Sequence, residues 1–207
     1  MESNTVITIS REFGSGGREV GKKLSEKLGI SFYDRDLISL AAEQSGMSRE
    51  VFENVDETAQ NPFFSNHAAS PYIPTGRFSV LNDISINDRL FFIQSDVIRS
   101  LAQKESCIIV GRCADYILRE NPNVINVFIF SDLQVRVARV AELYDLTEHE
   151  AKNITLKTDK RRASYYNYYS GKKWGRANSY HLSVDSGFTG IDNTVEAIGS
   201  YVGLMHK

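Results

Sequence analysis

The chain of 207 residues suits one α/β domain with a small inserted lobe, and its 42% hydrophobic and 24% charged residues are ordinary for a globular protein. Its formal net charge of −2 excludes a polycation that binds nucleic acid through overall charge, so an anion site must come from a local cluster. No apolar run reaches the roughly 18 residues of a membrane span, and no basic, apolar leader opens the chain, so we expect a cytoplasmic protein without a membrane partner.

The first expected element is a β-branched strand over 6–9, which is followed by three glycines within residues 14–17. Apolar residues then recur every four positions from Val20 to Leu28. This spacing predicts an amphipathic helix that ends at Gly29. The chain therefore opens as strand, glycine loop and helix.

A second strand is expected at 30–33. Asp34 or Asp36 then caps a helix that runs towards Gln44. The following segment, 46–86, contains three prolines and several aromatic residues. Disordered linkers lack this aromatic content, so we interpret 46–86 as an inserted lobe.

The second half of the chain alternates helices and strands. A helix with an apolar face through Leu90 and Val97 precedes the all-apolar run 107–110, which is typical of a parallel strand buried on both faces. Further strands are expected at 124–130 and 181–185, and further helices begin at Asp132, Thr147 and Asn193. Five strands that alternate with helices predict one α/β domain over 1–207, with a parallel sheet covered by helices on both faces.

The glycine loop is a candidate anion site. Glycines allow backbone N–H groups to turn towards an anion, and the N-terminus of the following helix adds positive potential. A tight turn without a ligand is the alternative, but a turn needs only one or two glycines. The residues expected to bind phosphate are Arg11, Gly14, Ser15, Gly16, Gly17, Arg18 and Glu19.

This loop departs from the Walker pattern G-x-x-x-x-G-K-[ST]. When the second glycine of the pattern is placed on Gly16, Arg11 occupies the position of the first glycine. Gly17 then replaces the lysine, and Arg18 replaces the hydroxyl that ligates Mg²⁺. Arg11 and Arg18 are the cations that remain to contact phosphate. No metal site is predicted, because the two cysteines and four histidines lack zinc-ligand spacing.

Several segments resemble the cytidylate kinase-like family, whose members are similar to P-loop nucleoside-monophosphate kinases but have an altered P-loop. The matching residues are 8–21, 32–38, 110–112, 159–162, Trp174 and 180–185. This resemblance spans nearly the whole chain and is most specific in the opening segment. It implies a three-layer P-loop kinase fold that uses nucleotide substrates, ATP and Mg²⁺, with 46–86 as the acceptor-binding lobe and 155–177 as the lid region.

The resemblance also implies roles for individual residues. Gly111 and Arg112 match a Gly-Arg-Asp that contacts the monophosphate in cytidylate kinases, with Cys113 in place of the Asp. Asp159 and Arg162 match an Asp-x-x-Arg motif of the lid helix, whose Asp helps to read cytosine. The implied roles are catalysis for Arg18, Arg112 and Arg162, acceptor binding for Asp34, Arg112 and Asp159, and lid closure for Arg161 and Arg162.

The basic segment 157–176, in which tyrosines alternate with lysines and arginines, has three interpretations. A lid over phosphates comes first, a solvated face packed on the core second, and a platform for single-stranded nucleic acid third. The acidic overall balance argues against the third, so nucleic acid is not an expected partner. Arg136 and Arg139 share a helix face, which lies either near the nucleotide or towards solvent.

The function expected from these residues is transfer of the ATP γ-phosphoryl group to a nucleoside monophosphate (CMP-like) or a similar small acceptor. The alternative is a non-catalytic protein that senses nucleotides or regulates through them, and whose loop has lost the chemistry of transfer. Both are compatible with an oligomer.

Overall fold

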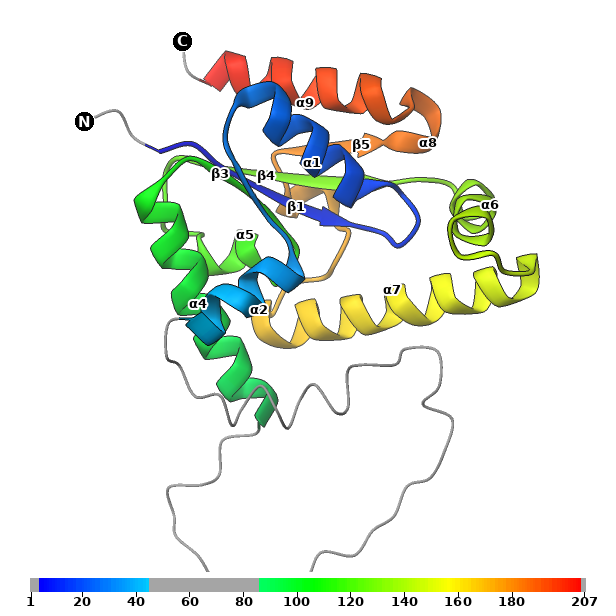
Figure 1. The fold of residues 1–207 in the computed structure, drawn as a ribbon, viewed down its shortest axis with the longest axis horizontal. Coiled ribbons are helices and arrows are strands. Elements are labelled where there is room, and N and C mark those ends of the chain that lie inside the picture. Colours follow the sequence, from blue (N-terminus) through cyan, green and yellow to red (C-terminus); the bar gives the residue numbers. More distant parts are fainter. Residues whose placement is uncertain (1–3, 45–85, 206–207) are drawn as a thin grey trace, which may run out of the picture.

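A computed structural model of the protein describes residues 4–44 and 86–205. Its centre is a five-stranded sheet in the order β2-β3-β1-β4-β5, and each adjacent pair of strands is parallel (Figure 1). The strands are β1 (Val6–Arg11), β2 (Ser31–Tyr33), β3 (Cys107–Val110), β4 (Val124–Phe130) and β5 (Leu182–Asp185). The predicted five-stranded parallel sheet is therefore confirmed.

Helices cover the sheet on both faces, as predicted. They are α1 (Gly17–Leu28), α2 (Arg35–Gln44), α4 (Ile86–Lys104), α5 (Ala114–Ile117), α6 (Leu133–Tyr144), α7 (Glu148–Ser170), α8 (Ser186–Thr189) and α9 (Ile191–Met205), with a 3₁₀ turn, η1 (Ala177–Ser179). Figure 1 shows α1 and α9 over one face and α4, α5 and α7 across the other, which gives three layers. Within the described residues, none of the helices has the length and apolar character needed to cross a membrane.

Two hydrophobic cores form because successive strand residues point to opposite faces of the sheet. Ile7 and Ile9 of β1 pack with residues of α1 and α9. Val6, with Cys107 and Ile109 of β3, packs instead with residues of α2, α4 and α7. The apolar strand 107–110 is fully buried, as its composition predicts.

Local capping signals account for most helix ends. Gly29 adopts a left-handed conformation and ends α1. Asp34 precedes α2 and accepts hydrogen bonds from the N–H groups of its first turn. Asp132 caps α6 in the same way, and the capping box predicted at Thr147 begins α7.

The last helix begins earlier than the sequence predicts. α9 starts at Ile191, so the predicted cap Asn193 lies inside its first turn. Gly190, with a φ of 76°, ends α8, and its carbonyl accepts the N–H of Thr194. The helix can start here because a glycine takes a positive φ without strain.

The sheet topology brings three loops together. β1 lies between β3 and β4, so the loops at 12–16, 111–113 and 131–132 meet at the carboxyl edge of the sheet. The predicted lid region, 155–177, comprises most of α7 and the turn that follows it. The predicted lobe at 46–86 lies, except for its last residue, outside the described residues.

Candidate functional site

The loop between β1 and α1 requires glycine at two positions. Gly14 and Gly16 have φ values of 81° and 76°, in the left-handed region. A Cβ atom at Gly14 would lie 2.8 Å from the carbonyl oxygen of Arg136, and a Cβ at Gly16 would collide with Ile191. The loop is therefore tightly packed on the elements beneath it, and its glycines are needed for structure as well as for any ligand.

Two serines anchor the middle of the loop. The Ser15 hydroxyl donates to the carbonyl oxygens of Glu12 at 2.9 Å and Ile129 at 3.2 Å. The Ser186 hydroxyl donates to the Ser15 carbonyl at 2.6 Å. The Ser15 side chain is buried and directed into the protein, and its backbone N–H donates to the Glu12 carbonyl at 3.4 Å, so its predicted contact with phosphate stays a prediction.

Arg136 and Asp159 clamp the start of the loop. The buried Arg136 donates from Nη1 to the Phe13 carbonyl at 3.1 Å and to Asp159 Oδ2 at 2.5 Å. Its Nε donates to the Ser131 carbonyl at 3.0 Å and lies 3.2 Å from Glu12 Oε2. The other Asp159 oxygen accepts the Phe13 N–H at 2.7 Å. Both oxygens of Asp159 thus hold the loop, and its acceptor role stays a prediction.

The first turn of α1 presents backbone N–H groups at the loop. Helix geometry leaves the first N–H groups without intrahelical partners. Within the described part of the chain, no acceptor hydrogen-bonds to the N–H groups of Gly16, Gly17 or Arg18, and no side chain caps Gly16. The Glu19 carboxylate pairs with Arg139 and Lys23. These backbone donors lie at the positive end of a helix, which is where the sequence predicts a phosphate cradle, and phosphate binding there stays a prediction.

Arg11 lies across this cradle. Its stem occupies the space beside Gly17, where an added Cβ would lie 2.6 Å from Arg11 Cβ and 2.8 Å from Cγ. Its guanidinium covers Gly111, the first residue of the loop after β3, at a distance that leaves no room for a side chain there. The Arg11 carbonyl accepts Nη1 of Arg162 at 3.2 Å.

Arg112 follows Gly111 in a strained loop. Arg112 and Cys113 have φ values of 58° and 56°, which residues other than glycine rarely adopt. Arg112 Nε donates at 2.8 Å to Oε1 of the buried Gln94, and the guanidinium lies 5.1 Å from the centre of the Tyr165 ring. Both partners are neutral, so they orient the arginine without neutralising its charge.

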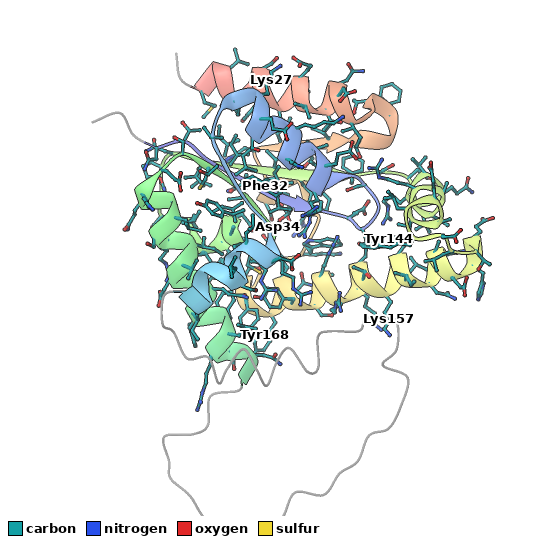
Figure 2. The ribbon with its side chains drawn as sticks, viewed as in Figure 1. Lys27, Phe32, Asp34, Tyr144, Lys157 and Tyr168 are labelled. Carbon is teal, nitrogen blue, oxygen red and sulfur yellow. The ribbon has the colours of Figure 1, made fainter. Side chains whose placement is uncertain are left out.

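Arg162 reaches the loop from α7. Its guanidinium lies 5.3 Å from the centre of the Phe13 ring, and Tyr144 stacks with the same ring at 6.1 Å. Figure 2 labels Tyr144 at the end of α6, above α7. Its neighbour Arg161 is exposed. Of the two predicted lid arginines, the structure therefore brings only Arg162 to the glycine loop.

Three guanidiniums gather here without an ionic partner. Within residues 4–44 and 86–205, no ion pair involves Arg11, Arg112 or Arg162. The pKa of Arg11 is lowered to about 9, first by burial and then by the charges of Arg162 and Arg112, with Asp34 partly opposing. Burial likewise lowers the pKa of Arg112, and that of Arg162 to about 10, with the charge of Asp159 partly opposing the shift of Arg162. Such a cluster favours an anion, which relieves the repulsion among the cations.

Arg18 has a different environment. Its Nε lies 2.7 Å from Asp34 Oδ2, and its side chain is 71% exposed, against 6% for Asp34 (labelled in Figure 2). Burial acts to raise the pKa of Asp34, but hydrogen bonds from Arg18 and from the first turn of α2 outweigh it, so the pKa is lowered. The charge of Arg18 is therefore partly neutralised, and its catalytic role stays a prediction.

Some side chains of the basic segment in α7 pack in the core, and others face solvent. Tyr169 stacks on Phe91 of α4 at 3.9 Å, and the hydroxyl of the buried Tyr166 donates to Asp115 at 2.7 Å. Tyr168, by contrast, is 72% exposed. Most of the tyrosines in this segment therefore pack against the core. This packing favours a helix face that rests on the core over a platform on which nucleic-acid bases stack.

Sequence reasoning did not anticipate the clamp made by Arg136. The prediction left it either near the nucleotide or towards solvent, and the second option is wrong because its side chain is buried. A signal was available, since Arg136 falls on the same helix face as Leu133, Val137 and Val140. The buried Gln94 behind Arg112 carries the same kind of signal, since it lies four residues after Leu90 and three before Val97 on the apolar face of α4.

Comparisons with known proteins find similar sequences and folds over nearly the whole chain. The model of the cytidylate kinase-like family matches residues 6–187. Cytidylate kinase from Archaeoglobus fulgidus is 29% identical over 199 residues, which cover 93% of this chain and 91% of that protein. The solved structure of an uncharacterized protein from Eubacterium ventriosum has a TM-score of 0.71 and 31% identity, over 97% of this chain and 99% of that one. Shikimate kinase from Bacteroides thetaiotaomicron shares the fold, with a TM-score of 0.56 and 14% identity over 96% and 98% of the two chains.

Proposed function

The chain belongs to the cytidylate kinase-like family, and on that premise we propose that it transfers the γ-phosphoryl group of ATP to a nucleoside monophosphate, CMP or a similar small acceptor. The observation that carries the proposal is the cluster of Arg11, Arg112 and Arg162 beside the glycine loop, with no carboxylate paired to any of them in the described part of the chain. Phosphoryl transfer requires mainly positioning and charge neutralisation, which such a cluster supplies.

Each element of the site has a separate task in this proposal. The N–H groups of residues 16–18 hold the donor phosphates, because they point outward at the start of α1. Arg162, held by Phe13 and the Arg11 carbonyl, meets the transferred group from the α7 side. Arg112, held by Gln94, lies at the end of β3 and meets the phosphate of the acceptor. A guanidinium suits both tasks because its fork matches two phosphate oxygens.

The residues present fit a triphosphate better than a protein-bound metal ion. Within the described residues, no group of three or more His, Cys, Asp or Glu side chains could hold a metal ion. Arg18 also replaces the hydroxyl that ligates Mg²⁺ in the Walker pattern. Kinases of this type use ATP together with Mg²⁺, which neutralises phosphate charge.

A second candidate function is a nucleotide sensor that binds ATP without transferring phosphate. It is favoured by the absence of the Walker lysine and hydroxyl and by the pairing of Arg18 with Asp34. In that case ATP would bind to the same amides and arginines, but no acceptor would be phosphorylated.

A coupled assay of ADP formation distinguishes the two functions. The wild-type protein is incubated with ATP, Mg²⁺ or Mn²⁺, and CMP, dCMP, UMP, AMP or GMP in turn, and ATP binding is followed by the shift in melting temperature. The proposal predicts turnover with at least one monophosphate. A melting shift with ATP but no turnover would select the sensor, and neither binding nor turnover would refute both.

A further inference from the structure

Two positions of the glycine loop have exchanged their side chains relative to the Walker pattern. That pattern places a glycine at the end of the strand and a lysine at the start of the helix. Here Arg11 is the last residue of β1 and Gly17 is the first residue of α1. The two positions touch, because a Cβ at residue 17 would lie only 2.6 Å from Arg11 Cβ and 2.8 Å from Cγ. The Arg11 stem and a side chain at position 17 therefore exclude each other.

Glycines also direct the end of the Arg11 side chain. Any side chain at Gly111 would collide with Arg11 Nη1, and its Cβ would lie 3.1 Å from Cζ. Gly111 has a φ of 83°, so its backbone conformation also favours glycine. The Arg11 stem therefore lies beside Gly17, at the start of α1, and its guanidinium lies beside Gly111, next to Arg112.

Arg11 lacks the carboxylate partners that fix the structural arginine Arg136 in the same site. Arg136, in the same site, is satisfied by two carbonyls and two carboxylates. The Arg11 side chain has no ion pair within the described residues, and the charges of Arg162 and Arg112 act against it. Arg11 is half-buried, and a half-buried cation without a partner destabilises the folded protein. Its presence here indicates a ligand that supplies the missing negative charge.

On the strength of the proposed function, we infer that Arg11 supplies the cation that the Walker lysine supplies in other P-loops, and that it contacts the donor phosphates from the end of β1. Arg18 is the competing candidate, but it is largely exposed and already paired with Asp34. On this inference, position 17 must be glycine because the Arg11 stem occupies the space that a side chain there would need.

The test measures the affinity for ATP, in the presence of Mg²⁺, by titration calorimetry for five proteins. They are wild type, Arg11→Met, Arg11→Gly, the exchange variant Arg11→Gly/Gly17→Lys, and the control Arg99→Met. Arg11→Met and Arg11→Gly are expected to bind ATP at least about tenfold more weakly, the loss of one charge-assisted hydrogen bond or more. The exchange variant is expected to recover most of this loss relative to Arg11→Gly, because its lysine restores the usual pattern. Arg99, in an exposed pair with Asp96 on α4, controls for the loss of one positive charge.

The apo melting temperature separates a ligand-binding role from a structural one. If Arg11 serves the ligand, Arg11→Met should melt no lower than wild type without ATP, because a half-buried, unpaired charge has been removed. Unchanged ATP affinity in Arg11→Met would overturn the inference and leave the proposed function in place. A lower apo melting temperature with unchanged affinity would show that Arg11 is structural. If wild type does not bind ATP at all, the inference and the proposed function both fail.

Discussion

Replacing Arg136 by methionine should destabilise the fold strongly, because this arginine joins the glycine loop to α6 and α7. Methionine keeps part of the stem but leaves the carboxylates of Asp159 and Glu12 without their cation. Breaking a buried ion pair by removing one partner costs about 3–5 kcal/mol. Asp159 is 15% exposed and Glu12 is 25% exposed, so water offsets part of this loss. We therefore expect a loss near the lower end, about 3 kcal/mol.

The assay is equilibrium unfolding in urea, followed by circular dichroism at neutral pH. Arg139→Met is the matched control, because Arg139 lies one turn further along α6 and pairs with Glu19 at the surface. Its loss should stay below about 1 kcal/mol. In a double-mutant cycle, Arg136→Met and Asp159→Asn should show a coupling energy of about 1–3 kcal/mol. Equal losses for Arg136→Met and Arg139→Met, or full additivity in the cycle, would refute the reasoning.

Three further predictions address the loop, a buried carboxyl and the acceptor side. Gly14→Ala should destabilise the protein by about 1–3 kcal/mol in urea unfolding, because its φ of 81° and the Arg136 carbonyl at 2.8 Å exclude a methyl group; a neutral effect would contradict the loop geometry. Burial raises the pKa of Asp115, so the native state holds the proton more tightly than the unfolded state, and stability falls as pH rises above about 4. The free energy of unfolding of Asp115→Asn should therefore fall less than that of wild type between pH 4 and 7. Parallel pH profiles for the two proteins would contradict this role of Asp115. Arg112→Ala should raise the KM for the acceptor by at least about tenfold with little change in melting temperature, and an unchanged KM would place Arg112 outside the site.

The secondary structure was predictable because its signals are local. The run 107–110 reads as a strand from four apolar residues, and the capping box that begins at Thr147 needs only four residues to be recognised. The start of the last helix was predicted at Asn193, but the helix begins at Ile191, directly after the turn at Gly190. The packing of α8 against α9, through Gly190, decides between these two starts.

The location of the candidate site was also predictable from local signals. Which of its arginines are paired with a carboxylate was not. The glycines at 14–17 between a strand and a helix locate the loop, and the order of strands places it at the carboxyl edge. The sequence offers both Arg11 and Arg18 as contacts for phosphate, and the predicted catalytic role went to Arg18 alone. Only the structure distinguishes them, because Asp34 pairs with Arg18 while the Arg11 side chain lies beside Gly17.

The sequence alone determined the order of elements, the parallel sheet and the position of the glycine loop, since each is indicated by residues a few positions apart. The tertiary structure decided which charges are paired and which are left for a ligand. Asp159 and Phe13 are 146 positions apart, and Arg162 and the Arg11 carbonyl are 151 apart. Contacts of that separation depend on how the sheet and helices pack, and no local pattern of residues records them.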